Sequence, residues 1–224
     1  MASYDGFRRA RNSALRRSSP FSGLTPRPDV ADDSRPAGHA GRTGVDVAMR
    51  VMGLAGWSGA GKTTLLARLI PELGRRGIRV STIKHAHHAF DVDKPGKDSH
   101  VHREAGAREV LVSSANRWAL MHELRGAPEP GLAELLARLS PVDLVLVEGF
   151  KHEGHPRIEV YRAQNGKPPL HPDDPGIVGV ASDVPLPQAG RPVAGLDDIV
   201  AVADLVLALA GPVADVRARL AAAR

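Results

Sequence analysis

The stretch GWSGAGKT at positions 56–63 constrains this chain more than any other, because it satisfies the pattern G-x-x-x-x-G-K-[ST]. In this pattern the glycines let consecutive backbone N–H groups point at phosphate oxygens, and the following helix adds its positive N-terminal end. The lysine, Lys62, reaches the β- and γ-phosphates, and the hydroxyl of Thr63 binds magnesium. A buried strand is predicted just before the motif by the apolar run VMGLAGW at 51–57. The sequence therefore predicts a nucleotide phosphate site at Gly56, Ser58, Gly59, Ala60, Gly61, Lys62, Thr63 and Thr64.

The rest of the chain alternates between strand and helix patterns. Leucines at helical spacing follow the motif, and Pro71 should kink or end that helix early. Further strands are predicted at 78–87, 109–114, 117–124, 143–150, 156–162 and 177–183, and further helices at 99–108, 129–140, 196–210 and 213–223. This order is typical of a doubly wound α/β fold, here a P-loop NTPase with a mostly parallel sheet and helices on both faces. We expect the hairpin at 109–124 and the strand at 156–162 to add antiparallel pieces at one edge.

A second magnesium element is predicted at the end of the run DLVLVEGF, positions 143–150. P-loop enzymes place an acidic residue at the end of a buried strand to hold the magnesium shell. Glu148 occupies that place, whereas Asp143 lies at the opposite end of the strand. We expect Thr63 and Glu148 together to hold Mg²⁺. One class of P-loop proteins carries an extra lysine early in the loop, but Trp57 stands there in this chain, so catalytic help must come from elsewhere.

Asp183 is a candidate for reading the nucleotide base. It follows the strand IVGVAS and precedes two prolines, which suits a base-reading loop. A carboxylate matches the N1–H and exocyclic amine of guanine, whereas adenine offers one donor beside an acceptor at the same edge. No N-K-x-D pattern is present, and a strand-end turn carrying a common turn residue is the competing interpretation.

The charged stretch DVDKPGKDS at 91–99 follows the second strand of the predicted sheet, where the chain leaves the carboxyl ends of the strands. Lys94 and Lys97 can reach a terminal phosphate from there, and Asp93 or Asp98 can reach the water shell of the metal. The alternative is a solvated loop in which Asp98 or Ser99 caps the next helix. We interpret the stretch as a loop that senses nucleotide or substrate. Lys84, at the end of the preceding strand, joins the predicted nucleotide site.

Composition excludes several other classes. The chain has 224 residues and no cysteine, which rules out disulfides, cysteine metal sites and a cysteine nucleophile. The net charge is +5, but residues 1–49 hold eight of the 30 basic and only five of the 25 acidic residues, so the remainder is nearly balanced. The chain has no clustered basic run and few aromatic residues, and both features argue against nucleic-acid binding. No apolar run of membrane-spanning length occurs, and we expect a cytoplasmic protein without membrane contact.

Histidines are numerous in this chain, at ten in all, and include the cluster KHAHH at 84–88. Pairs at i, i+2 on a strand share a face, so a zinc site is conceivable. No H-E-x-x-H or similar spacing occurs, and polar loop residues near a phosphate site are the favoured interpretation.

Residues 1–48 are rich in Arg, Ser, Pro, Gly and Ala and poor in large apolar side chains. This composition predicts a disordered tail followed by one nucleotide-binding domain at 49–224. An Arg- and Ser-rich transit peptide is one alternative. Translation beginning at Met49 is another, which native peptides from residues 2–40 would contradict.

Several segments of the chain together resemble the molybdopterin-guanine dinucleotide biosynthesis protein B (MobB) family. They are GWSGAGKTTLLARLIPEL, IKHAHHAFDVDKPGKDS, AGAREVLVSSANRWALMHE, DLVLVEGFKHE and VGVASDVPL, and they lie within about residues 50–210. The resemblance implies a homodimeric protein that binds GTP and hydrolyses it slowly. It also implies an accessory role in molybdenum cofactor maturation, in which a MobA-like guanylyltransferase attaches GMP to molybdopterin.

Three functions remain open from the sequence: a GTP-binding adaptor, a P-loop small-molecule kinase, and a scaffold with a vestigial nucleotide site. A kinase would need a base, for which Asp91, Asp93 or Asp98 are candidates. For GTP hydrolysis, Lys62 and Mg²⁺ would hold the γ-phosphate and Glu148 would orient the water shell of the metal. A second cation would steady the transition-state charge, with Lys84, Lys94 and Lys97 as candidates. We take Lys62, Glu148 and Lys97 as the catalytic set.

Overall fold

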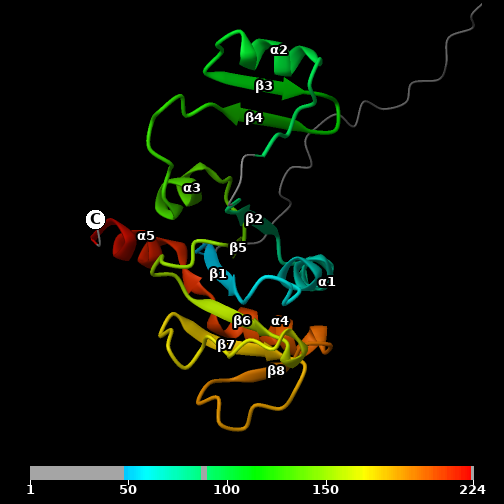
Figure 1. Cartoon of the computed structure of the whole chain (residues 1–224), viewed down its shortest axis with the longest axis vertical. Helices are drawn as coiled ribbons and strands as arrows, with labels where there is room; N and C mark the ends of the chain where they lie inside the picture. Colours follow the sequence, from blue (N-terminus) through cyan, green and yellow to red (C-terminus); the bar gives the residue numbers. More distant parts are fainter. Residues whose placement is uncertain (1–47, 87–89, 223–224) are drawn as a thin grey trace, which may run out of the picture. The chain divides into compact units, whose positions relative to one another are not determined.

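The computed structural model describes residues 48–86 and 90–222 (Figure 1). Its centre is a seven-stranded sheet in which six strands run parallel in the order β2-β5-β1-β6-β7-β8. A short ninth strand, β9, pairs antiparallel with the beginning of β1. The strands of this sheet are β1 (Arg50–Ala55), β2 (Val80–Lys84), β5 (Leu144–Glu148), β6 (Arg157–Tyr161), β7 (Ile177–Ser182), β8 (Val193–Gly195) and β9 (Gly211–Pro212). The mostly parallel sheet confirms the predicted fold class, although β8 and β9 were too short to be foreseen.

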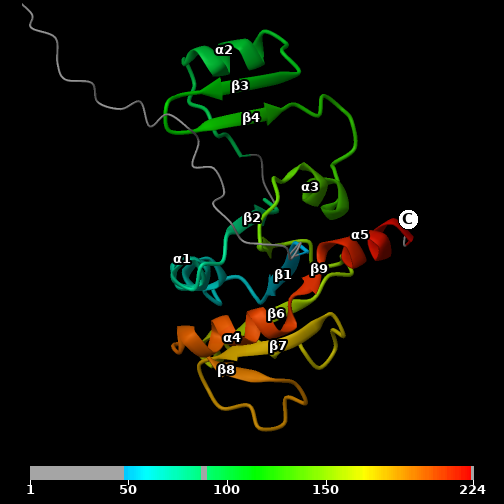
Figure 2. The same ribbon diagram turned by 180° about the vertical axis from the view of Figure 1, so that it is seen from behind.

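Four helices cover the two faces of this sheet. They are α1 (Lys62–Arg75), α3 (Leu132–Arg138), α4 (Ile199–Leu209) and α5 (Val213–Ala222), and Figure 2 shows them from behind. Side chains of β1 and β5 alternate between the two faces, as the period of a strand requires. Met52 and Leu146 join a core cluster with α1 and α4, whereas Val51 and Val145 join a second cluster with α3 and α5. Both faces of the central strands are therefore buried, which explains their continuous apolar runs.

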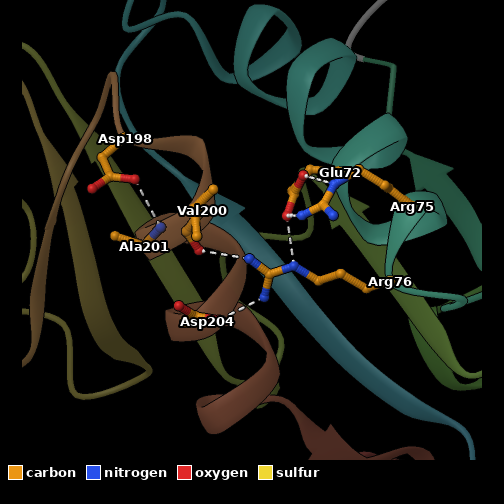
Figure 3. A network of polar contacts seen from close by, with 7 residues as sticks. All are labelled: Glu72, Arg75, Arg76, Asp198, Val200, Ala201 and Asp204. Carbon is orange, nitrogen blue, oxygen red and sulfur yellow. Dashed lines mark hydrogen bonds and ion pairs between the residues drawn. The ribbon is translucent and has the colours of Figure 1, made fainter.

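Helices α1 and α4 are also joined by a polar network at their surface (Figure 3). The guanidinium of Arg76, the residue that follows α1, contacts both Glu72 of α1 and Asp204 of α4. It also donates to the carbonyl oxygen of Val200. Hydrogen bonds from Arg75 and Arg76 lower the pKa of Glu72 to about 2, so this carboxylate stays charged at any physiological pH. The network joins the C-terminal end of α1, the helix that follows the phosphate-binding loop, to α4.

The expectation that Pro71 would end the first helix early is wrong. Helix α1 continues past it to Arg75. Proline lacks the N–H that would bond four residues back, which weakens a helix interior. Leu69 and Leu73, on either side of Pro71, are fully buried in the core, and we attribute the continuation of the helix to that packing.

The strand at 156–162 is not an antiparallel edge strand, as we had expected. β6 pairs parallel with both β1 and β7 and lies inside the sheet. Two features explain why the sequence did not predict an interior strand here. It carries charged residues that are nevertheless buried, Arg157 and Glu159. Moreover, the connection from β5 spans only residues 149–156, which is short for a parallel crossover.

Glu159 tolerates complete burial because its carboxylate is satisfied by one distant loop. It accepts hydrogen bonds from the backbone N–H of Leu170 at 2.7 Å and of His171 at 2.9 Å. The imidazole Nδ1 of His171 lies 2.8 Å from the same carboxylate. Buried charges persist where such partners exist, so Glu159 anchors the loop after β6 from inside the sheet.

The predicted hairpin forms, but it does not join the central sheet. β3 (Glu109–Ser113) and β4 (Trp118–His122) pair with each other as a separate two-stranded antiparallel sheet. A short helix, α2 (Asp98–Glu104), precedes them. Cross-strand pairing places Leu111 opposite Leu120 and Ser113 opposite Trp118, so these four side chains share one face. The apolar members of that face are exposed, at 61% for Leu111, 47% for Leu120 and 67% for Trp118.

The predicted tail at 1–48 lies almost entirely outside the described residues, as does the alternative of a transit peptide. Translation beginning at Met49 stays a prediction. His87 and His88 of the predicted histidine cluster also lie outside them. Within residues 48–86 and 90–222, no helix combines the length and the apolar character needed to cross a membrane.

Candidate functional site

The phosphate-binding loop connects the carboxyl end of β1 to the beginning of α1, as the motif predicts. Gly56 has φ of 139°, and a Cβ there would lie 2.6 Å from the carbonyl oxygen of Val160 on β6. Gly61 has φ of 89° and is the residue that precedes the first turn of α1. Both positions require glycine, because other residues rarely adopt such angles. The loop can therefore present its backbone N–H groups, together with the helix end, to an anion.

Lys62 folds back over this loop. Its ammonium group donates to the carbonyl oxygens of Gly56 at 2.9 Å and Trp57 at 3.1 Å. Burial lowers its pKa, an effect that Glu148 opposes and that the neighbouring cations Lys151 and Lys84 reinforce. A bound phosphate would add negative charge close to this half-buried cation and so raise its pKa again.

Thr63 and Glu148 meet at the mouth of the loop. The Thr63 hydroxyl lies 3.2 Å from Oε1 and 3.4 Å from Oε2 of Glu148. Lys84 Nζ approaches the same carboxylate at 3.8 Å, because Lys84 and Glu148 are paired across β2 and β5. A hydroxyl and a carboxylate oxygen are the hard ligands that Mg²⁺ takes beside phosphate oxygens. The described residues thus fit a magnesium ion bound between Thr63, Glu148 and a nucleotide.

A cavity of about 510 Å³ opens beside these groups. Its charged residues are Lys62, Lys84, Glu148 and Lys151. Lys151 was not among the residues predicted from the sequence, although its place three residues after Glu148, at the carboxyl end of β5, was a usable signal. The cavity is lined by Leu54, Ala55, Gly56, Ser58, Lys62, Lys84, His85, Ala86, Phe90, Glu148, Gly149 and Lys151.

The segment after β6 covers the other side of the loop. Arg162 Nε donates to the carbonyl oxygen of Ala60 at 3.2 Å, and Asn165 Nδ2 donates to that of Ser58 at 3.4 Å. The indole N–H of Trp57 donates to the carbonyl oxygen of Pro168 at 2.9 Å. Arg162 and Asn165 were not predicted as site residues, because both follow a strand that we had assigned to the edge of the sheet.

Asp183 lies at the end of β7 and contacts the same segment. Its Oδ1 accepts a hydrogen bond from the backbone N–H of Ala163 at 3.0 Å. Asp183 is exposed, and its second carboxylate oxygen can accept further bonds. The structure therefore places Asp183 beside the loop segment that covers Ser58 and Ala60, and its role in reading a base stays a prediction.

The stretch 91–99 is placed differently from the motif residues. The carboxylate of Asp93 is only 5% exposed and contacts Arg103 of α2 at 3.0 Å. Helix α2 begins at Asp98 with Lys97 as its N-cap and without a side-chain cap, so the expected capping by Asp98 or Ser99 is wrong. None of the described residues lining the cavity beside the P-loop comes from 91–99. A nucleotide role for Asp93, Lys94, Lys97 and Asp98 stays a prediction.

The other predicted residues of the loop occupy places that suit their types. Ala60 is buried, whereas Ser58, Gly59 and Thr64 are exposed. Thr64 lies in the first turn of α1. Within the part of the chain that the structure describes, no three His, Asp or Glu side chains are grouped as metal ligands, so the conceivable zinc site gains no support there.

Comparison with known proteins gives the family. The profile of Molybdopterin guanine dinucleotide synthesis protein B (MobB) matches residues 51–183, from β1 to Asp183. This chain belongs to the MobB family. The resemblance noted from the sequence is thereby confirmed, and the matched range contains the P-loop, Glu148 and the segment after β6.

Two curated relatives and one solved structure agree with this family. The Escherichia coli molybdopterin-guanine dinucleotide biosynthesis adapter protein is 47% identical over 160 residues, which cover 70% of this chain and 91% of the relative. The protein of the same name from Haemophilus influenzae is 44% identical over 70% of this chain and 86% of its own length. A crystal structure of molybdopterin-guanine biosynthesis protein B superimposes with a TM-score of 0.56 at 27% identity, covering 70% of this chain and 98% of that one.

Proposed function

We propose that this protein is a GTP-binding accessory protein in the biosynthesis of molybdopterin guanine dinucleotide. The observation that carries the nucleotide part is the convergence of Lys62, Thr63 and Glu148 at the mouth of the P-loop. The accessory role rests on family membership and on the name adapter protein that the Escherichia coli and Haemophilus influenzae relatives bear.

Slow hydrolysis of GTP would follow from positioning and charge stabilisation. Lys62 would bind the terminal phosphates, and Thr63 with Glu148 would hold Mg²⁺, which supplies charge neutralisation when bound. A further cation is needed near the γ-phosphate. Lys84 and Lys151 line the cavity, and Lys97 remains the candidate from the sequence.

The proposed partners follow from the same family and from the surface. A guanylyltransferase of the MobA kind would perform the nucleotide transfer that this protein assists, with molybdopterin as the acceptor. The exposed face of the hairpin formed by Leu111, Trp118 and Leu120 supports a homodimer, because contiguous apolar patches mark interaction sites. The small-molecule kinase gains no support from Asp93, whose carboxylate is engaged by Arg103.

Calorimetry with GTP and ATP, each with and without Mg²⁺, tests the proposal. We expect GTP with Mg²⁺ to bind best, and Lys62→Ala to abolish binding. Arg138→Ala, which removes an exposed cation from the last turn of α3, is the matched control and should bind as the native chain does. Equal affinity of Lys62→Ala and native protein would refute the site. Guanylyltransferase stimulation that survives Lys62→Ala would instead favour a scaffold with a vestigial nucleotide site.

A further inference from the structure

A second cavity of about 470 Å³ lies next to the 510 Å³ cavity beside the P-loop, which we call the nucleotide cavity. The two cavities share His85 and Lys151 as lining residues. Its other lining residues are Phe150, His152 and Glu153 of the loop after β5, and Glu129, Pro130 and Gly131 before α3. Two ligands, one in each cavity, would therefore lie close to each other near Lys151.

The aromatic wall of this second cavity is held in an unusual backbone conformation. Phe150 has φ of 51°, a value that residues other than glycine rarely adopt. Gly149 before it has φ of 103°, and a Cβ there would lie 2.5 Å from Cβ of His85. The result is that the Phe150 ring stacks on the imidazole of His85, with centroids 4.7 Å apart and planes 24° apart. Backbone strain of this kind is retained mainly at functional sites.

The loop that carries Phe150 is fixed from behind by a buried cation. Nη1 of Arg157 donates to the carbonyl oxygens of Lys151 at 2.7 Å and Glu153 at 2.9 Å. Nη2 of Arg157 forms an ion pair with Asp174 at 2.7 Å. The wall of the cavity is thus preorganised, which lowers the entropy cost of binding a ligand.

The chemistry of the lining selects one kind of ligand. The ring pair offers a surface for a flat heterocycle, because stacking on aromatic side chains tolerates any π face. Glu129 contacts Nε2 of His85 at 2.8 Å but remains 64% exposed. A carboxylate accepts several hydrogen bonds at once, so Glu129 can also bind an adjacent N–H and amino pair. Lys151 supplies positive charge for an anionic arm, and the His152 imidazole can add a hydrogen bond to it.

We propose that this second cavity binds a phosphorylated pterin, with its ring against Phe150, its amino-pyrimidine edge at Glu129 and its phosphate directed toward Lys151. The proposal rests on the proposed function, in which the acceptor is molybdopterin. Since Lys151 also lines the nucleotide cavity, the pterin phosphate would lie beside the phosphates of GTP. The protein would then hold both precursors of the dinucleotide side by side.

Fluorescence titration of the full chain with hydroxymethylpterin phosphate tests this assignment. We expect saturable binding that persists in the presence of saturating GTP and Mg²⁺. Phe150→Leu and Glu129→Gln should each weaken probe binding at least about tenfold, whereas Phe150→Tyr, which keeps the ring, should bind as the native chain does. Glu104→Gln changes an exposed carboxylate on α2 that lines neither cavity and serves as the matched control.

GTP affinity, measured on the same variants, separates the two proposals. Native protein that binds GTP but not the probe overturns the pterin site and leaves the proposed function intact. Native protein that binds the probe but not GTP overturns the nucleotide function and leaves the pterin site standing. The pterin site is also overturned if GTP or guanosine displaces the probe, or if Phe150→Leu and Glu129→Gln, shown to be folded by circular dichroism, bind it unchanged.

Discussion

The hydroxyl oxygen of Thr63 lies 3.2 Å from Oε1 of Glu148, although 85 positions separate the two residues along the chain. The contact exists because β1, which leads into the P-loop, pairs parallel with β5 in a register that sets Leu54 opposite Glu148. A metal ion bound by both side chains would replace this hydrogen bond and tie the P-loop to the end of β5.

Glu148→Gln should remove most of the magnesium dependence of GTP binding. The amide keeps the shape of the side chain but lacks the charge that attracts the ion. In the presence of Mg²⁺ we expect GTP to bind at least about tenfold more weakly, which corresponds to about 1.4 kcal/mol. Calorimetry at several Mg²⁺ concentrations measures the effect. Asp143→Asn, one residue before the opposite end of β5, is the control, and a Glu148→Gln variant with native magnesium dependence would remove Glu148 from the site.

Asp183→Asn should loosen discrimination between GTP and other purine nucleotides. The asparagine carbonyl can still accept the hydrogen bond from Ala163, so the local fold is kept while the charge is lost. Competition of GTP against ITP and ATP measures the change, since ITP lacks the exocyclic amine. We expect the preference for GTP to fall about tenfold, as for loss of one charged hydrogen bond. Asp173→Asn is the exposed control, and an unaltered preference in Asp183→Asn would leave guanine recognition to other groups.

The P-loop and Glu148 could be predicted from the sequence because their signals are local. Glycines and a lysine at fixed spacing define the loop, and an apolar run that ends in a carboxylate defines the second element. The hairpin was equally local, since two alternating runs are joined by a short turn. Whether the hairpin joins the central sheet depends on tertiary contacts, and a local sequence pattern does not predict these.

The contacts beyond the P-loop depended on β6, and the sequence misled us there. Arg157 and Glu159 have charged side chains, yet both are buried. Asp174 pairs with Arg157, and His171 forms a hydrogen bond with Glu159. Partners so far along the chain leave no local signature. With β6 assigned to the edge, Arg162 could not be expected to contact the P-loop, which it does through Ala60.

Leu111→Lys should convert a homodimer into a monomer. Leu111 is paired with Leu120 on the exposed face of the hairpin, and a charge at the centre of an apolar interface is costly to desolvate. Analytical ultracentrifugation of the full chain measures the mass. Val200→Lys introduces the same charge at an exposed apolar position of α4 and should leave the native mass unchanged. A Leu111→Lys variant that remains dimeric would place the interface elsewhere.

Arg157→Met should destabilise the fold and release the loop after β5. Removal of the guanidinium leaves Asp174 without its ion-pair partner and two loop carbonyls without their donor. We expect the free energy of unfolding to fall by on the order of 3 kcal/mol, because the Arg157 side chain is only 7% exposed and holds several partners. Urea denaturation measures stability, and hydrogen exchange at residues 151–153 should increase.

The matched control for this change is Arg79→Met. The Arg79 side chain is 51% exposed in its ion pair with Asp143, and pairs open to solvent contribute at most about 1 kcal/mol. If Arg79→Met and Arg157→Met proved equally destabilising, the loop after β5 would not depend on Arg157 in particular.

His155→Leu should reduce the sensitivity of the fold to acid. The imidazole is 1% exposed, and neither ring nitrogen has a hydrogen-bond partner among the residues that the structure describes. Burial, reinforced by the charge of Arg157, lowers its pKa to about 4. Because the unfolded chain takes up this proton near pH 6.5 and the folded chain does not, stability falls as the pH drops from about 6.5 to about 4. The loss of folding free energy over this range reaches about 3 kcal/mol, since each tenfold change in proton affinity corresponds to about 1.4 kcal/mol.

Urea denaturation of the native chain and of His155→Leu at pH about 7 and about 4.5 measures this effect. At the higher pH we expect the leucine variant to match or exceed the native stability, since no hydrogen bond is lost and apolar surface stays buried. At the lower pH the variant should keep more of its stability than the native chain does. His102→Leu, at an exposed position of α2, is the control and should retain the native pH dependence. An unchanged acid dependence in His155→Leu would mean that His155 is not the group that titrates with unfolding.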